Sequence, residues 1–340
     1  MAESIISSGS KISIIIPGWN ESRNISNCME SLKKQTNNRF NVFMILGGED
    51  TTFIEMAKNA DWEQLIVLDQ VEPNKMKAYN AVLGHPELGD ILVFSDMDCE
   101  FPDDFLELYN DAFANKERNI LTGRVRPDPR SKSFVDRYHR NFEEMIAPGS
   151  LKIDRSIIGS NFAVRKEFLL NRFGLFDESI AIGTDKVISK RFNEIGEPIY
   201  FDPRIIVYTQ FFSAGFLKYI NQQTRWIRIR LLLNKKSNPK AFRKSIVTLL
   251  ISWLMCVVIP LSFVFSKHMI ASQFILFFWF GFIIIAWLKR YIILRRGREH
   301  VLIKDLMGAL GLLAIHFGIQ ILASFQVISK KHKYRWKSLA

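Results

Sequence analysis

Two aspartates separated by one residue are the first feature of the sequence that has the chemistry of a metal site. Asp96 and Asp98 directly follow the short apolar run 91–94, which predicts that both carboxylates lie at the end of a buried strand. Alternate residues of an extended segment share a face, so we expect Met97 to point into the core. Carboxylate oxygens are suited to Mg²⁺ or Mn²⁺, and such a cation can bridge to phosphate. Two solvated carboxylates at a strand end are the simpler alternative.

The elements that position these aspartates alternate between strand and helix. Apolar runs of strand length occur at 12–16, 43–46, 65–68 and 91–94, and helix-like stretches occur at 24–35, 51–60 and 74–83. This order predicts a layered α/β domain with parallel strands. Ligands of such sheets bind beyond the carboxyl ends of the strands. Residues 17–21, 47–50 and 95–98 are therefore expected around one binding site.

The charge of the chain is concentrated near its apolar part. The 340 residues carry a formal net charge of +12. No Asp or Glu occurs between Asp202 and Glu299, and basic residues gather before a long apolar segment: Lys218, Arg225, Arg228, Arg230, Lys235, Lys236, Lys240, Arg243 and Lys244. This is typical of a cytosolic membrane flank, and it disfavours nucleic acid as a partner. Residues 1–10 are polar and do not resemble a signal peptide, so the N-terminal half is expected to be cytosolic.

The C-terminal part is expected to form a membrane domain at 245–328. Segments 245–265 and 270–288 are each close to the ~20 apolar residues that cross a bilayer. A third apolar segment, 306–328, precedes a basic tail at 329–340, and both a spanning and a re-entrant path stay open. Region 213–244 is predicted to hold an amphipathic interfacial helix. Three scattered cysteines, Cys28, Cys99 and Cys256, are expected to be reduced thiols.

Several short motifs occur in an order that resembles the family 2 glycosyltransferases. They are Pro17-Gly18-Trp19-Asn20-Glu21, a Gly-rich acidic turn at 47–50, Lys75-Met76-Lys77-Ala78-Tyr79-Asn80, Asp96-Met97-Asp98, Gly159-Ser160-Asn161, Thr184-Asp185 and Gln222-Gln223-Thr224-Arg225-Trp226. The resemblance covers residues 11 to about 226. It implies a nucleotide-diphospho-sugar (GT-A) fold at 11–212, an inverting reaction, a UDP-type donor bound through a divalent cation and a cytosolic active site.

The resemblance also assigns roles to residues. It implies donor contacts from Pro17, Trp19, Glu21, Asp50, Lys75, Asn80, Asp96, Gly159 and Asn161. Asp96 and Asp98 correspond to the metal site, with Asp98 as the direct ligand. Asp185 corresponds to the general base that takes the proton of the acceptor hydroxyl, although Thr184-Asp185 also fits a helix cap.

Two departures from the family pattern concern the donor and the acceptor. Gly47-Gly48-Glu49-Asp50 replaces an aspartate-rich turn, so Asp50 or Glu49 must take over its contact. Thr184 stands where many relatives have Glu. Gln222, Arg225 and Trp226 match the Q-x-x-R-W motif of polysaccharide synthases and ceramide glucosyltransferases, which implies acceptor and diphosphate contacts together with Thr184. An interfacial Arg-Trp anchor is the alternative for this motif.

The number of predicted spans bears on the acceptor. Two clear spans and one doubtful span are too few for a pore formed by one chain. We therefore expect transfer of one or a few sugars to a membrane lipid or lipid-linked acceptor. A processive polysaccharide synthase that forms a homo-oligomer or uses a partner subunit is the first alternative, and a non-catalytic membrane scaffold is the second.

Overall fold

The computed structural model describes residues 10–131, 133–146, 152–154, 156–180, 183–209, 216–237 and 239–254, and short helical pieces within 281–292 and 315–323. Its contacts divide the chain into two compact units. The first holds the described residues up to 129 and those between 147 and 210, and the second holds the described residues within 130–146 and 211–333. Segment 130–146, which lies within the predicted catalytic domain at 11–212, groups with the later helices in the second unit.

The first unit is built on one mixed sheet. Its strands are β1 (Ile12–Trp19), β2 (Phe40–Gly47), β3 (Leu65–Asp69), β4 (Ile91–Ser95), β5 (Cys99–Glu100), β6 (Ile120–Pro127), β7 (Lys152–Asp154), β8 (Asn161–Arg165) and β9 (Ile199–Thr209). The order is β3-β2-β1-β4-β8-β6-β9-β5, and β7 pairs with β9. The first four strands are parallel to their neighbours among themselves, as predicted, whereas β8 runs antiparallel to β4 and β6.

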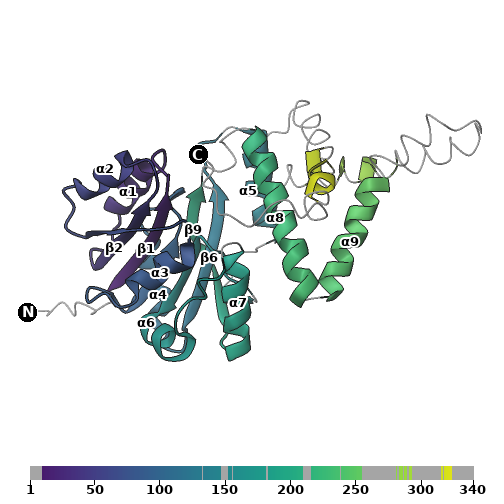
Figure 1. Ribbon diagram of the computed structural model, residues 1–340. Helices are drawn as coiled ribbons and strands as arrows, with labels where there is room; N and C mark the ends of the chain where they lie inside the picture. The colour runs from purple at the N-terminus through teal and green to yellow at the C-terminus, as the bar shows by residue number, and fades with distance from the viewer. Residues whose placement is uncertain are drawn as a thin grey trace, which may run out of the picture. The chain divides into compact units, whose positions relative to one another are not determined.

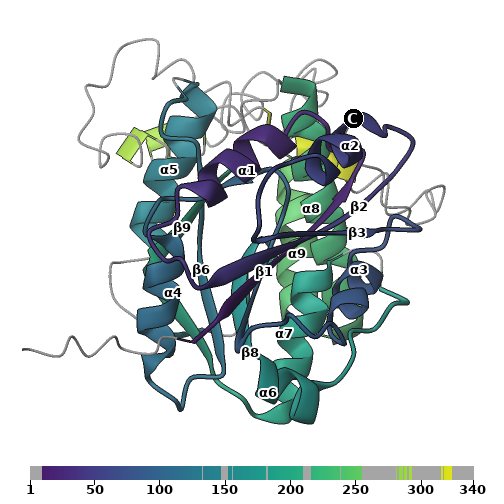
Figure 2. The same cartoon turned by 90° about the vertical axis from the view of Figure 1, so that its left-hand side faces the viewer.

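Helices cover both faces of this sheet (Figures 1 and 2). One face is covered by α1 (Ile25–Lys33), α2 (Thr52–Lys58) and α4 (Phe105–Ala114). The other is covered by α3 (Lys75–Val82), α6 (Lys166–Phe168), a π-helical turn at Leu169–Phe173 and α7 (Thr184–Ile195). The first unit is therefore a three-layer α/β domain, as the alternation of strand and helix predicts.

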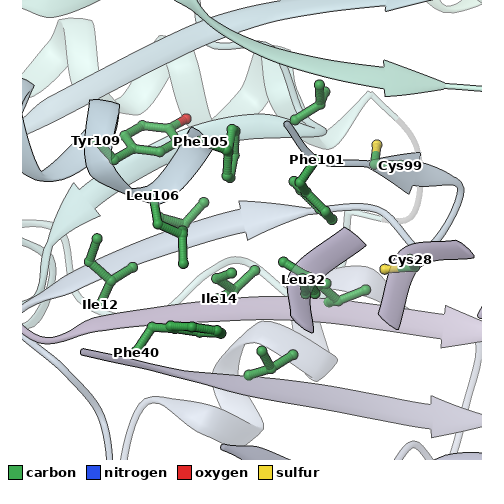
Figure 3. Packing of buried hydrophobic residues seen from close by; sticks show 14 of the residues in the cluster. Ile12, Ile14, Cys28, Leu32, Phe40, Cys99, Phe101, Phe105, Leu106 and Tyr109 are labelled. Atoms are coloured by element: carbon green, nitrogen blue, oxygen red, sulfur yellow. The ribbon is translucent and has the colours of Figure 1, made fainter. Parts of the chain in front are cut away.

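The two faces of β1 show why the chain folds into three layers. Ile12 and Ile14 point toward α1 and α4, where they join Leu32 and Leu106 in a buried cluster (Figure 3). Ile15 belongs to the cluster on the opposite face. A strand covered on both sides has apolar residues at successive positions, which explains the unbroken run of isoleucines. Burial of these side chains fixes the sheet whose edge carries the site.

Cys28 and Cys99 agree with the prediction of reduced thiols. Both are free and buried, and burial raises the pKa of each thiol well above its ordinary value. The two cysteines are therefore neutral core residues. Cys256 lies outside the described residues.

The second unit contains α5 (Phe134–Ile146), α8 (Phe216–Ser237) and α9 (Pro239–Trp253). Tyr138, Tyr219 and Ile319 form a small buried cluster in it. The Tyr219 hydroxyl lies 3.3 Å from His139 Nε2 and 2.9 Å from His316 Nε2, which connects α5, α8 and the 315–323 piece.

The membrane part of the prediction concerns residues that are mostly not described. Within the described ranges, no helix has both the length and the apolar character needed to cross a bilayer. Most of the predicted spans 245–265, 270–288 and 306–328 lies outside those ranges, as does the basic tail 329–340.

Candidate active site

The turns after β1 and β2 are joined by an asparagine that sequence reasoning left without a role. Trp19 pairs with Gly47 at the parallel strand ends. The next residue, Asn20, has a φ of 57° and donates its N–H to the Gly47 carbonyl at 3.1 Å. Its Oδ1 accepts the N–H groups of Glu49 and Asp50 at 2.8 and 3.2 Å. Asn is one of the few residues that tolerate this left-handed conformation. An asparagine directly after a strand was therefore the signal in the sequence for this turn.

Trp19 packs against the backbone of Gly47. A Cβ at Gly47 would lie 2.9 Å from the Trp19 ring and 2.0 Å from the Gln70 carbonyl oxygen, so this position requires glycine. The Trp19 side chain is half-buried and Pro17 is buried. A half-buried indole can offer its exposed surface to a base or sugar ring.

Two carboxylates stand beside this turn. Asp50 Oδ1 accepts bonds from Thr52 N at 3.0 Å and Thr52 Oγ1 at 2.5 Å. Hydrogen bonds from the Thr52 and Ser22 side chains lower the pKa of Asp50, so it is ionised near neutrality. Glu21 Oε2 accepts Asn24 Nδ2 at 2.7 Å. The structure brings both predicted donor residues to the same edge of the sheet.

Asp96 and Asp98 lie in a turn and not on an extended strand. β4 ends at Ser95, so the extended backbone expected for this motif is wrong. The expected distribution of side chains is nevertheless present, because Met97 is 2% exposed whereas both aspartates are half-buried. Met97 fits beside Gly18, where a Cβ would lie 2.9 Å from its methyl carbon. The tight core contact at Met97 orients the two carboxylates outward.

Thr209 is a second site residue to which sequence reasoning gave no role. It ends β9 and pairs with Cys99 of β5, and its hydroxyl donates to Asp98 Oδ2 at 3.5 Å. The threonine is 3% exposed. It comes from a strand more than a hundred residues later, so only the sheet order reveals that it supports the predicted metal ligand.

Lys75 connects Asp96 to the loop that precedes β8. Its Nζ forms an ion pair with Asp96 and donates to the Gly159 carbonyl oxygen at 3.1 Å. The side chain is 12% exposed. Burial alone would lower the pKa of Lys75, but Asp96 and Tyr79 raise it above its ordinary value. The amine therefore stays charged, as the predicted role beside a diphosphate requires.

Gly159 in turn contacts Asp185. A Cβ on Gly159 would lie 3.2 Å from the Asp185 Cβ and 3.8 Å from its carboxyl carbon. Burial raises the pKa of Asp185, and the N–H of Lys186 and the charge of Lys75 oppose this shift. A carboxylate with a raised pKa is a better proton acceptor than an exposed one. The predicted base therefore lies next to Gly159, whose carbonyl oxygen accepts a hydrogen bond from Lys75.

The start of α7 bears on the alternative reading of Asp185. The cap position is Gly183, with a φ of 69° and no side-chain capping bond, and Thr184 is the first helical residue. Thr184 and Asp185 are therefore not the residue at the cap. The carboxylate lies in the first turn, where the helix dipole favours negative charge.

Asn161 is engaged in the sheet, which argues against its predicted contact with the donor. Its side chain is 0% exposed. The amide nitrogen donates to the carbonyls of Arg124 at 2.7 Å and Ile205 at 3.1 Å, and the amide oxygen accepts the Tyr109 hydroxyl at 2.7 Å. A buried amide with all its donors used joins β6, β8, β9 and α4. Its role is to hold the strands together beneath the site.

Asn80 is likewise bonded within the protein. Its Nδ2 donates to the Phe176 carbonyl and to Glu178 Oε1, both at 2.9 Å, and its Oδ1 accepts the Phe176 N–H at 2.9 Å. Both amide hydrogens are used within the protein, and the contact of Asn80 with the donor stays a prediction. The amide contacts the loop before α7.

The Q-x-x-R-W motif lies on α8, in the second unit. Gln222 and Thr224 are 7% and 2% exposed, and Trp226 is 39% exposed. Gln222 Oε1 and Thr224 Oγ1 are buried without a hydrogen-bond partner within the described part of the chain. Unsatisfied buried oxygens are costly and rare in folded proteins. The acceptor roles of Gln222, Arg225 and Trp226 stay predictions.

Adding a methyl group at Gly159 tests the contact with Asp185. We expect Gly159→Ala to lower kcat by about 10- to 100-fold, because the carboxylate must shift by a few tenths of an ångström from its productive position. The affinity for the donor and the Tm should change little. Steady-state nucleotide release measures the effect. Gly84→Ala is the matched control, since a Cβ there meets nothing within 4 Å, and equal rates for the two variants would contradict the prediction.

Comparison with solved structures gives the same fold. A mannosyltransferase from Pyrobaculum calidifontis in complex with GDP-Man and Mn²⁺ is 16% identical, with a TM-score of 0.56 over 96% of this chain and 89% of that chain. GalNAc-T7 with UDP, GalNAc and Mn²⁺ is 14% identical, with a TM-score of 0.49 over 60% of this chain. S. aureus TarS is 14% identical, with a TM-score of 0.45 over 73% of this chain. The matched region spans 44% of each of the latter two proteins.

The sequence comparisons decide the family. No curated protein matches the chain. The family model described as glycosyltransferase like family 2 matches residues 10–228, a range that contains every predicted site residue from Pro17 to Trp226. The chain is therefore a glycosyltransferase that belongs to family 2 and has the GT-A fold.

Proposed function

We propose that this glycosyltransferase moves one sugar, with inversion, from a nucleotide-diphospho-sugar to a hydroxyl group of a membrane lipid or lipid-linked acceptor. The donor we favour is a UDP-sugar. The family supports the transfer of sugar, and the site residues support the details that follow. The first four strands end beside the residues assigned to the donor, as expected for a ligand at the carboxyl edge of a parallel sheet.

One observation carries this proposal: Asp185 and Asp96 are connected through two intermediate groups. Asp96 pairs with Lys75, Lys75 donates to the Gly159 carbonyl, and Gly159 lies against Asp185. A buried cation next to one carboxylate and a partly buried second carboxylate of raised pKa are suited to hold a diphosphate and to accept a proton, respectively. The proposed reaction needs both functions at the same site.

The proposed reaction uses two side chains of this protein, Asp185 and Lys75. The acceptor hydroxyl gives its proton to the Asp185 carboxylate while its oxygen attacks the anomeric carbon from the side opposite the diphosphate. The new C–O bond forms as the bond to the phosphate oxygen breaks, and the electron pair leaves with the nucleotide. Lys75 holds negative charge on the diphosphate. One base and one displacement give inversion.

A divalent cation fits this site only together with the donor. Asp98 and Asp96 supply carboxylate oxygens, the ligands that Mg²⁺ and Mn²⁺ prefer. Among the described residues, no group of three or more His, Cys, Asp or Glu is arranged to hold a metal ion. Such cations are usually completed by substrate phosphates. When bound, the cation neutralises charge on the departing nucleotide. The mannosyltransferase neighbour contains Mn²⁺, which supports this assignment.

The membrane acceptor is supported by the composition of α8 and α9. Their basic residues have no acidic counterparts between Asp202 and Glu299. Val247, Leu250, Ile251 and Leu254, on and directly after α9, are each more than a third exposed. Basic residues next to exposed apolar side chains are typical of a surface that contacts a bilayer. We propose that the catalytic domain lies on the cytosolic side.

Donor profiling tests the proposed function. Purified protein is given UDP- and GDP-sugars with Mn²⁺, with and without membrane lipid, and released nucleotide and labelled lipid are measured. We expect a UDP-sugar to label lipid. Release from GDP-sugars alone would overturn the UDP assignment and agree with the donor of the mannosyltransferase neighbour.

The Q-x-x-R-W motif supports a processive polysaccharide synthase as the second candidate. The same assay separates the two candidates by product length. Long water-soluble polymer formed without lipid would replace the lipid acceptor with the growing chain. The absence of any transfer with intact metal and nucleotide binding would instead favour the non-catalytic scaffold.

A further inference from the structure

The Asn80 amide contacts the loop formed by residues 173–180, which leads to α7. Three bonds of 2.9 Å join the amide to the Phe176 backbone in both directions and to Glu178 Oε1. Asn74, at the start of the same helix, donates Nδ2 to the Glu178 carbonyl at 2.7 Å. Two asparagines, one at the start of α3 and one within it, thus form hydrogen bonds with backbone groups of this loop.

The 173–180 loop is also held from the other side. Arg191 of α7 donates to the carbonyls of Leu175, at 3.0 Å, and Phe173. Its guanidinium lies 4.4 Å from the centre of the Phe173 ring. Phe176 is 3% exposed and packs on Tyr79 of α3 with ring centres 5.3 Å apart. The loop therefore connects α3 to α7 by contacts at both ends.

α3 and α7 carry the two side chains that act in the proposed reaction. α3 begins with Lys75, which holds Asp96, and α7 carries Asp185 in its first turn. The same Lys75 contributes to the electrostatic environment of Asp185.

We infer that Asn80 is a positioning residue for the sugar transfer, which sets the place of Asp185 relative to Lys75 by fixing the 173–180 loop onto α3. This inference rests on the proposed function of Asp185 as the base. It gives Asn80 an indirect role in the reaction, in place of the contact with the donor that the family resemblance implies. The amide acts on acceptor activation and leaves binding of the donor to other residues.

The fold itself does not depend on the Asn80 amide. α3 is held in the core by Met76, Tyr79 and Val82, which are each at most 1% exposed. The Asn80 side chain is half-buried by comparison. Its removal should loosen the loop without unfolding the helix, because apolar burial supplies most of the stability of a packed helix.

The experiment compares Asn80→Ala with Asn41→Ala in the full-length protein. Asn41 is 5% exposed at the start of β2, away from the carboxyl ends of the strands, and its amide bonds Ser13 and Glu87. It is the same substitution of a bonded asparagine in the same unit. For Asn80→Ala we expect kcat to fall about 10- to 100-fold with the KM for the donor within about twofold, as for a misplaced catalytic group. Asn41→Ala should leave kcat unchanged even where it lowers the Tm.

A second measurement does not depend on activity. Hydrogen exchange of the backbone amides 184–189 should be faster in Asn80→Ala than in the wild type and in Asn41→Ala, because the start of α7 loses its anchor. Asn74→Ser keeps a good capping residue for α3 but removes the bond to Glu178, and it should show a smaller change of the same kind. Exchange no faster than in Asn41→Ala would overturn the inference.

The two measurements separate the inference from the proposed function. A wild-type protein that transfers no sugar would remove the proposed function, while the exchange data would still decide whether Asn80 anchors α7. An active wild type whose kcat is unaffected by Asn80→Ala would overturn the positioning role. A rise in the donor KM without a fall in kcat would also overturn it and return Asn80 to a donor contact.

Discussion

Replacing Asp185 with Asn is expected to lower kcat by about 10²- to 10⁴-fold, the range that a positioned general base contributes. The amide fills the same space next to Gly159 but cannot accept the acceptor proton. Binding of UDP in the presence of Mn²⁺ should stay within about twofold of the wild type, since the residues assigned to the donor are unchanged. Titration calorimetry and single-turnover rates measure the two quantities separately.

The pH dependence provides the control for this variant. Burial raises the pKa of Asp185, so wild-type kcat should fall as the pH drops through a value above the ordinary Asp pKa of about 3.9. The small residual rate of Asp185→Asn should lack this decline. An unchanged kcat, or the same acid decline in both proteins, would remove Asp185 from the role of base.

The same pKa shift has a consequence for stability. A carboxyl whose pKa is higher in the folded state stabilises the fold below its unfolded-state pKa and loses that contribution as the pH rises through the folded-state value. At neutral pH the ionised Asp185 therefore opposes folding. The Tm of Asp185→Asn at pH 7 should equal or exceed that of the wild type, whereas at acidic pH the difference should disappear.

Replacing Asp98 with Asn should produce the second large effect, on binding as well as on rate. We expect the affinity for Mn²⁺ in the presence of UDP to fall by more than about 100-fold, because loss of a direct ligand exceeds the 10- to 100-fold effect of residues behind the ligands. The side chain keeps its size beside Thr209 and Met97, so the fold should be retained. Electron paramagnetic resonance of free Mn²⁺ measures the loss.

Asp61→Asn is the control for this variant, since Asp61 is exposed and no hydrogen bond of its side chain is part of the site. It removes the same charge from the protein surface. A similar loss of Mn²⁺ affinity in both variants would show that net charge, and not coordination by Asp98, attracts the cation. Full affinity in Asp98→Asn would assign the cation to other residues.

The parts of the fold that follow from local pattern were predictable. Successive apolar residues in β1, β2 and β4 indicated strands covered on both faces, and the structure confirms the parallel pairing. The insertion of β8 between β4 and β6 was not predictable, because β8 pairs with a strand about seventy residues earlier and with another about forty residues earlier. Such pairing carries no local signal.

The site residues divide in the same way into those whose role follows from residue type and those whose role depends on long-range contacts. Asp96 and Asp98 were identified by their chemistry and spacing and Lys75 by its family position, and the fold brings Lys75 to Asp96. Asn80 and Asn161 were assigned to the donor by family position, but their bonds are directed to the Phe176 backbone and to the strands. An amide can satisfy a ligand or a loop equally well, and only the fold shows which of these it contacts.

We propose that Asp98 holds a cation on the donor diphosphate close to Asp185. A crystal structure with UDP and Mn²⁺, recorded at the manganese absorption edge, tests this placement of the cation. We predict an anomalous peak at about 2.1 Å from an Asp98 carboxylate oxygen, as for a small divalent cation, with the diphosphate between it and Lys75. An ordered UDP with the manganese peak away from Asp98 would show that Asp98 does not hold the cation.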